Sequence, residues 1–145
     1  MTLNDYRFHA VWSLPAAASR VFEALVDLTS WPLWWRDVRA VHRVDDDTAE
    51  LVCRSTLPYA LIFRLHRAVQ DERSGRLRVD MTGDLEGHTE AVVTGTGVAH
   101  LVIDQQVVVT KPLLRAFAPV ARPLLLANHA LMMRRGQRGL RTYLN

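Results

Sequence analysis

The sequence predicts an α+β domain in which a curved antiparallel sheet of about seven strands wraps around one long C-terminal helix. Three observations predict it: a strand pattern followed by two short helical patterns, a long middle section of alternating polar and apolar residues, and an apolar, helix-prone final stretch. The apolar face of such a sheet must be covered, and the final helix is the only expected element large enough. A chain of 145 residues has room for one core, so a single domain over residues 1–145 is expected.

The first third of the chain predicts one strand and two short helices. Residues 6–14 largely alternate between an apolar and a polar face, which is typical of a half-buried strand, and Pro15 ends this pattern. Residues 16–28 then place apolar side chains at helical spacing. Ser30 is a candidate N-cap and Pro32 an early helical position, so a short second helix is expected to follow.

The middle section predicts six more strands joined by short turns. Such short gaps favour hairpins and therefore an antiparallel meander. The expected strands cover residues 38–44, 49–56, 59–70, 76–83, 86–94 and 97–109. After them, Pro112 begins a short helical turn, Pro119 marks a break, and a long helix is expected from residue 120 to residue 143, because proline is tolerated only near a helix start.

The composition bears on partners and compartment. Hydrophobic residues make up 49% and charged residues 23%, the balance of an ordinary globular protein. The net charge is +3, and Lys111 is the only lysine, an arginine bias that is typical of a GC-rich genome. The arginines are interleaved with acidic residues, whereas a nucleic-acid-binding protein would cluster its positive charge. No apolar run is long enough to cross a membrane and no signal-type segment is present. We therefore expect a cytoplasmic protein, a monomer or a homodimer, without a nucleic-acid partner or stable membrane insertion.

The sequence contains no recognisable metal or nucleophile motif. Cys53 is the only cysteine, which excludes an intramolecular disulfide, and its apolar neighbours predict a small buried side chain. The six histidines show no His-x-x-x-His or Glu-x-x-His spacing, and no Gly-x-Ser-x-Gly string is present. Neither a metal nor a cofactor is therefore expected.

Four strings of residues carry a resemblance to a known superfamily. They are Trp31-Pro32-Leu33-Trp34-Trp35, Leu57-Pro58-Tyr59, Gly83-Asp84-Leu85-Glu86-Gly87, and the final-helix residues Asn128-His129, Met132-Met133, Gly136 and Gly139-Leu140. Together with the order of elements, they make the whole chain resemble the START-related superfamily (SRPBCC, Bet v 1-like), and within it the bacterial polyketide cyclase/dehydrase-like branch. The resemblance implies a helix-grip fold with a deep cavity between the sheet and the final helix, in proteins that range from enzymes to carriers.

The strand patterns nominate three residues that would line this cavity, and the resemblance nominates a fourth. Tyr59 and Phe63 fall on the more apolar face of their strand, and Met81 falls on the corresponding face of the next one. Ala91 stands where related sequences often carry a large aromatic residue, which would enlarge or reshape the cavity.

The helical patterns nominate five more lining residues. Trp34 and Trp35 form either a hydrophobic plug between the short helices and the sheet or part of the pocket wall. His129 shares a face of the final helix with Met133, so it serves either in packing or in ligand binding. Met132 and Met133 are flexible and suit a pocket that accepts varied apolar shapes.

One pair of residues is a candidate for acid–base catalysis. On the strand expected over residues 97–109, His100 and Asp104 share their parity with Val98 and Val102. If the valines face the helix, the pair points into the interior, where it would orient a carbonyl or abstract a proton. The opposite parity, or a bulge, would place both in solvent, and both alternatives stay open.

Three functions compete on this evidence. The first is the binding of a hydrophobic small molecule, lipid-like or polyketide-like, by a carrier or sensor. The alternative is a polyketide cyclase or dehydratase that acts on such a ligand through His100 and Asp104. The third is a partner-binding or stress-related protein whose cavity is incidental.

Overall fold

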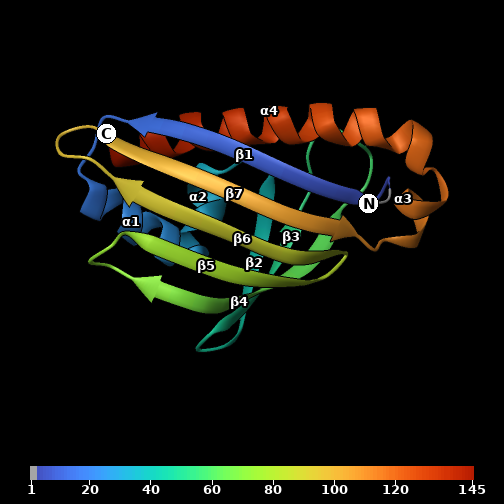
Figure 1. Ribbon diagram of the computed structural model, residues 1–145, viewed down its shortest axis with the longest axis horizontal. Helices are drawn as coiled ribbons and strands as arrows, with labels where there is room; N and C mark the ends of the chain where they lie inside the picture. Colours follow the sequence, from blue (N-terminus) through green and yellow to red (C-terminus); the bar gives the residue numbers. More distant parts are fainter. Residues whose placement is uncertain (1–2) are drawn as a thin grey trace.

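The computed structural model describes residues 3–145, which form a seven-stranded sheet, two short helices after the first strand and a long final helix (Figure 1). The strands are β1 (Asp5–Leu14), β2 (Val38–Asp45), β3 (Thr48–Cys53), β4 (Leu61–Asp71), β5 (Arg76–Gly83), β6 (Leu85–Thr94) and β7 (Ala99–Val109). The helical segments are α1 (Ala18–Val26), the 3₁₀ turn η1 (Leu28–Ser30), α2 (Trp31–Trp34), α3 (Pro112–Ala116) and α4 (Ala118–Leu144).

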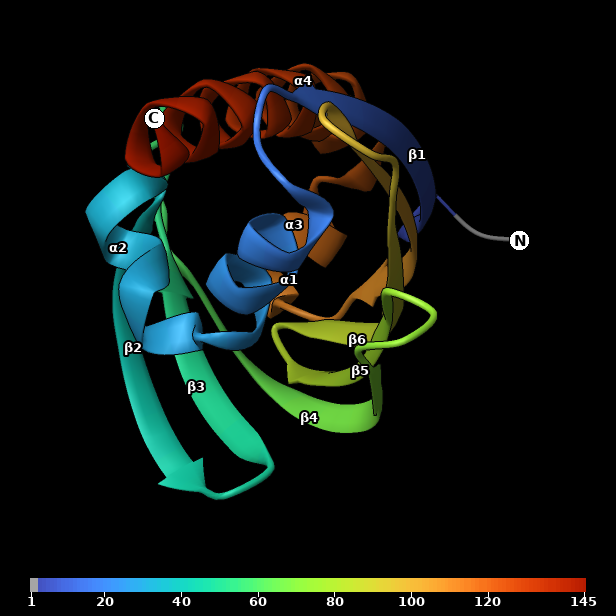
Figure 2. The ribbon, with the colours of Figure 1, turned by 90° about the vertical axis from the view of Figure 1, so that its left-hand side faces the viewer.

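All seven strands belong to one antiparallel sheet in the order β1-β7-β6-β5-β4-β3-β2. Strands β2 to β7 are neighbours in chain order, whereas β1 joins the sheet beside β7. Figure 2 shows that the sheet curls around an interior that α4 closes. The helix contacts β1 on one side and α2, which packs on β2, on the other. The predicted α+β helix-grip architecture is confirmed.

Tryptophans and glycines seat α4 against α2. A Cβ on Gly136 would lie 2.6 Å from the Trp35 ring, and a Cβ on Gly139 would overlap the backbone carbonyl of Trp34, so only glycine permits this approach. The Trp35 indole donates a hydrogen bond of 3.0 Å to the carbonyl of Met132. The last third of α4 is thereby held close to α2.

A buried ion pair ties the same part of α4 to the start of β2. The Asp37 carboxylate is fully buried and lies 3.1 Å from the Arg135 guanidinium. Arg135 also donates to the hydroxyls of Ser55 and Thr56. This interaction connects α4 to the segments on both sides of the β2–β3 hairpin.

The structure differs from the predicted boundaries at helix ends. Ser30 does not cap α2, because its hydroxyl donates to the Asp27 carbonyl at 2.7 Å. The break between the last two helices falls at Phe117 rather than Pro119, since Pro119 takes an early position of α4 where its missing N–H costs no hydrogen bond. Within residues 3–145, no helix is both long and apolar enough to cross a membrane.

Candidate functional site

The inner face of the sheet is closely packed at both ends and half-buried in the middle. At the α1 end, Trp12, Leu101 and Val93 are adjacent on β1, β7 and β6 and are at most 5% exposed. At the α3 end, Tyr6 pairs with Val107, and both are 3% exposed. Between these ends lie two rows of half-buried residues, which we call the central belt: Ala10, Ile103, Ala91 and Leu77, then Phe8, Gln105, Thr89 and Val79.

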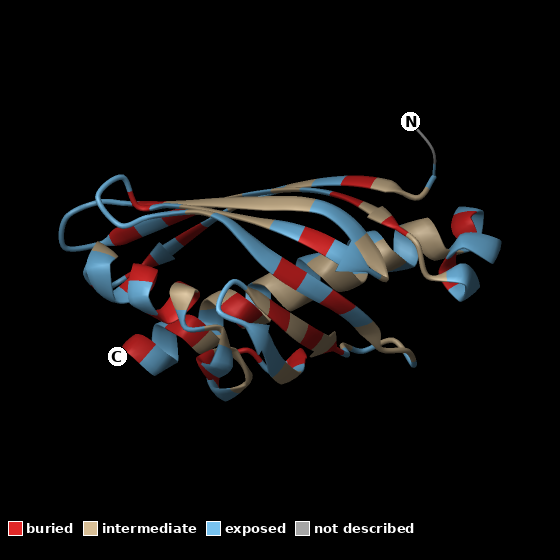
Figure 3. Cartoon of the chain, turned by 90° about the horizontal axis from the view of Figure 1, so that it is seen from below, coloured by how far each residue is buried: buried red, intermediate tan, exposed pale blue. Residues whose placement is uncertain are grey.

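The part of α4 above the central belt is also half-buried. Leu125, His129, Met132 and Met133 pack against the core without being enclosed by it, and Figure 3 shows much of this stretch of the helix in the intermediate colour. A close-packed interior leaves no room around its side chains. The inward-facing side chains of the central belt therefore keep contact with solvent, unlike those at the two ends of the sheet.

A chain of polar contacts crosses the central belt from the helix to the sheet. His129 Nε2 lies 3.1 Å from Gln105 Oε1. The amide nitrogen of Gln105 donates to Met81 Sδ at 3.7 Å, and the Thr89 hydroxyl donates to the same sulfur at 3.3 Å. The ring of Phe8 stacks on the imidazole. These contacts give the apolar inner face a polar centre with a defined orientation.

Burial keeps the His129 imidazole neutral. It lowers the pKa of His129 to about 4, because the charged form would lose its hydration. With Gln105 Oε1 facing the ring, the neutral imidazole donates from Nε2 and leaves Nδ1 as an acceptor. The site therefore presents a hydrogen-bonding group without a charge.

Besides Asp37 Oδ1, two buried side-chain polar atoms have no hydrogen-bond partner among the described residues. They are the Tyr59 hydroxyl oxygen and Asn128 Oδ1. Burial, with a smaller contribution from Tyr6, raises the pKa of Tyr59 to about 12, so its hydroxyl stays protonated and available as a donor. Buried polar groups are normally satisfied, so these two atoms are candidates for hydrogen bonds with a bound molecule.

The structure places the predicted lining residues in two groups. Phe63, Met81 and Ala91 lie on the inner face, and Tyr59, Met132 and Met133 are half-buried beside the core.

Trp34 and Trp35 instead lie in the joint between α2 and α4. They are 5% and 9% exposed and stack on each other with ring centroids 5.5 Å apart. Trp35 also meets Trp12 edge-on. This geometry favours the plug over the pocket wall.

Of the two alternatives for His100 and Asp104, the structure shows the outward one. Both are exposed, because Ala99, Leu101 and Ile103 take the inner face of β7. His100 Nδ1 instead lies 3.2 Å from the Ser13 hydroxyl. Val98 and Val102, on which the inward alternative depended, share the outward parity of His100 and Asp104.

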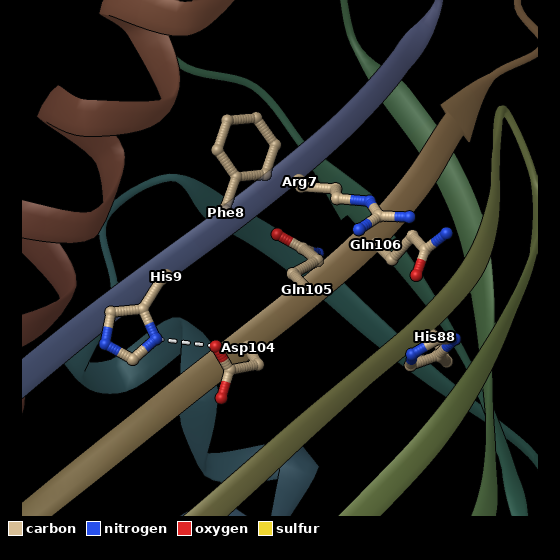
Figure 4. Close-up of a pocket in the computed structure, with 7 residues that line it drawn as sticks. All are labelled: Arg7, Phe8, His9, His88, Asp104, Gln105 and Gln106. Carbon is tan, nitrogen blue, oxygen red and sulfur yellow. Dashed lines mark hydrogen bonds and ion pairs between the residues drawn. The ribbon is translucent and has the colours of Figure 1, made fainter. Parts of the chain in front are cut away.

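Asp104 forms part of a shallow hollow of about 240 Å³ on the outer side of the sheet. Figure 4 shows its carboxylate joined to His9, with Arg7, Gln106 and His88 nearby. The His9–Asp104 pair is 2.6 Å long, and both side chains are more than 60% exposed. Water therefore screens this pair, unlike the contacts of the central belt.

A second open hollow, of about 500 Å³, lies where β4 and β5 meet Lys111. Its charged groups are already paired: Lys111 lies 3.5 Å from Asp84, and Arg64 lies 3.5 Å from Glu50. No residue of α4 lines either hollow.

The sequence reasoning missed Phe8, Thr89, Gln105 and Asn128. Tyr6 and Trp12 share the parity of Phe8, so its strand pattern already pointed inward. Gln105 carried no such signal, since a polar residue in an alternating strand is normally assigned to the outer face.

Cys53 is buried as predicted, and burial raises the pKa of its thiol to about 12, which keeps it unreactive. Within residues 3–145, no group of His, Cys, Asp or Glu is arranged to hold a metal ion.

Solved structures match this chain over nearly its whole length at low sequence identity. The Zhui aromatase/cyclase from Streptomyces sp. R1128 aligns with a TM-score of 0.78 and 13% identity, over 97% of this chain and 93% of that one. A START superfamily protein from Mycobacterium smegmatis aligns with a TM-score of 0.73 and 13% identity, over 95% and 96%. The di-domain aromatase/cyclase BexL aligns with a TM-score of 0.76 and 11% identity, over 99% of this chain and 51% of that one.

Neither a protein-family model nor a curated protein sequence matches the chain. The structural matches lie below the identity at which function can be transferred, so they establish the fold alone. On these matches, the chain has the helix-grip fold of the START/Bet v 1-like superfamily.

Proposed function

We propose that this chain binds a hydrophobic small molecule, lipid-like or with a polyketide-like ring system, between the central belt and α4. The observation that carries the proposal is the contrast along the inner face, where a half-buried middle section lies between two closely packed ends. Binding sites for small molecules are mostly apolar, with a few polar groups that orient the ligand. The central belt and the side chains above it have this composition.

The polar atoms of the site indicate what the ligand carries. Tyr59 offers a hydroxyl donor, while Asn128 Oδ1 and His129 Nδ1 are acceptors. None of these groups is charged. A ligand with hydroxyl or keto groups would satisfy them, whereas a fully ionised ligand would find no compensating charge.

Acid–base catalysis of the cyclase or dehydratase type is the second candidate function. It is supported by the structural similarity to two aromatase/cyclases and by the presence of one neutral imidazole in the site. His100 and Asp104 lie on the opposite side of the sheet, so the reaction would use His129. A pKa of about 4 makes His129 a weak base at neutral pH, which favours binding over catalysis.

Ligand extraction and thermal shift test the binding proposal. Native mass spectrometry of the purified protein is expected to show a co-purifying apolar molecule. A panel of fatty acids, quinones and aromatic polyketides is expected to include compounds that raise the Tm. If the protein carries nothing and no compound of the panel raises the Tm, the proposal is wrong.

A matched pair of variants locates the site. Ala91→Trp fills the central belt and is expected to abolish the ligand-dependent rise in Tm. Val11→Trp adds the same ring on the exposed outer face of β1 and is expected to leave that rise unchanged. Equal ligand responses of the two variants would place the site elsewhere.

A further inference from the structure

The charge of this chain is divided unevenly along the sequence. Residues 105–145 contain Lys111 and six arginines but no aspartate or glutamate. The preceding 104 residues hold all 15 acidic residues and 11 of the 18 basic ones. The interleaving of charges that the sequence suggested therefore holds only before residue 105. The final helices form a wholly basic segment of a chain that is otherwise slightly acidic.

The same helices expose apolar side chains. Leu113 is 56% exposed, Phe117 59%, Val120 67% and Leu124 52%. Phe117, Val120 and Leu124 follow one another at intervals of three and four, so they lie on one face at the start of α4, and Leu113 lies in α3 just before them. Figure 1 shows that α3 and the first turn of α4 project beyond the end of the sheet. A surface helix normally presents polar side chains to water, so this face needs a partner.

The apolar face continues into a basic one along α4. Leu131 is exposed and lies two turns beyond Leu124, and the exposed Arg134 and Arg138 follow at intervals of three and four. We call the whole series the outward stripe: Leu113, Phe117, Val120, Leu124, Leu131, Arg134 and Arg138. The inward side of this part of α4 carries His129 and Met132, so the stripe is separate from the candidate ligand site.

We propose that the outward stripe is a docking surface for an anionic lipid bilayer. Its apolar half would enter the boundary between headgroups and acyl chains, and Arg134 and Arg138 would meet lipid phosphates. Such docking is peripheral, since no helix within residues 3–145 can cross a membrane.

The charge pattern favours a bilayer over a second copy of this chain. A parallel pairing of two stripes would bring arginines against arginines, and an antiparallel pairing would set Arg138 against Phe117 or Val120. No acidic residue of the segment is present to compensate in either arrangement. An anionic bilayer accommodates both halves of the stripe at once. The shape agrees, because neither of the two hollows described above is lined by residues of α3 or α4, and these helices project beyond the end of the sheet (Figure 1).

Co-sedimentation with vesicles tests this proposal. The protein is expected to bind vesicles of equal parts phosphatidylglycerol and phosphatidylcholine at least about tenfold more tightly than vesicles of phosphatidylcholine alone. Binding is expected to weaken in about 0.5 M NaCl, because the arginine contribution is screened. Absence of binding to the anionic vesicles would overturn the proposal.

Variants of the stripe make the test specific. Phe117→Ser with Leu124→Ser, and separately Arg134→Gln with Arg138→Gln, are each expected to lower vesicle binding by about tenfold or more. The control is Val11→Ser with Ile62→Ser, which removes equally exposed apolar side chains from the outer face of the sheet. Circular dichroism verifies that each variant is folded.

Equal vesicle binding by the stripe variants and the control would overturn the proposal. Analytical ultracentrifugation supplies the other decisive outcome. If the wild-type protein is a dimer and the apolar stripe variant a monomer, the stripe is a protein interface and the bilayer proposal is wrong. Neither result depends on whether the central belt binds a ligand.

Discussion

His129 of α4 stacks on Phe8 of β1, with ring centroids 3.5 Å apart and ring planes inclined by 9°. The same imidazole reaches Gln105 on the neighbouring strand, so one side chain joins the helix to both β1 and β7. Because the stacked ring is shielded from water, its charged form is disfavoured. The helix is therefore held on the sheet by a histidine whose protonation state affects the stability of the fold.

The His129 contact predicts a loss of stability in mild acid. The folded-state pKa of about 4 lies below the unfolded value of 6.5, so the unfolded chain binds more protons between these two pH values. The free energy of unfolding is thus expected to fall as the pH drops from 6.5 to about 4, by about 3 kcal/mol, with no further contribution below that range. Urea unfolding at a series of pH values measures this change in the free energy of unfolding.

His129→Gln isolates this contribution, since glutamine can still donate to Gln105 but does not titrate. The variant is expected to show a flatter dependence of stability on pH between 4 and 6.5. His42→Gln, at an exposed position of β2, is the control and is expected to leave the dependence unchanged. Identical pH profiles for the wild type and His129→Gln would contradict the prediction.

Substitution of His100 or Asp104 is expected to leave ligand binding intact. Both side chains lie on the outer face, and the exposed His9–Asp104 pair contributes at most about 1 kcal/mol. The informative comparison is between adjacent residues of β7 with opposite parity: Asp104→Ala keeps the ligand-dependent rise in Tm, and Gln105→Ala lowers it. The reverse result would move the site to the hollow beside His9.

Most of the architecture could be predicted from local sequence patterns. Alternation and short turns predicted the strands to within a few residues, and helix-compatible spacing after Pro112 predicted the long helix α4 that covers the sheet. Both signals are local, because they depend on the preferences of neighbouring residues. The order of six strands in the sheet followed from hairpin connections, and only β1 pairs outside the chain order.

The orientation of β7 could not be read in the same way. Val98 is 47% exposed, whereas Gln105 points inward to His129. Valine is favoured in strands on either face, so its apolar character does not identify the buried side. Gln105 is accommodated inside because partners from α4 and β5 satisfy its amide, and those contacts exist only once the sheet and helix are assembled.

Loss of the Arg135 side chain is expected to destabilise the fold. Arg135→Ala would leave the fully buried Asp37 carboxylate without its ion-pair partner, at a cost of about 2–4 kcal/mol. Arg138→Ala removes an exposed arginine one turn along α4 and is expected to change stability by less than about 0.5 kcal/mol. Urea unfolding of both variants gives the comparison.

The double variant Asp37→Leu/Arg135→Leu separates lost charge pairing from lost packing. It removes both charges and is expected to recover part of the stability that Arg135→Ala loses, because no uncompensated carboxylate remains. A double variant no more stable than Arg135→Ala would mean that packing, rather than the buried charge, accounts for the effect.

Gly139→Ala tests how closely α4 is seated on α2. In an unobstructed helix this substitution would stabilise the protein by about 0.5–1 kcal/mol, because alanine has the higher helix propensity. Here the added methyl group would overlap the backbone carbonyl of Trp34, which cannot move without displacing the tryptophan cluster. The expected change is therefore opposite in sign, a loss of about 3 kcal/mol, with altered near-ultraviolet circular dichroism from the tryptophans.

Thr142→Ala, at an exposed position of the same helix, is the control and is expected to be neutral or slightly stabilising. If Gly139→Ala stabilises the protein as the control does, α4 and α2 do not pack as closely as the structure shows.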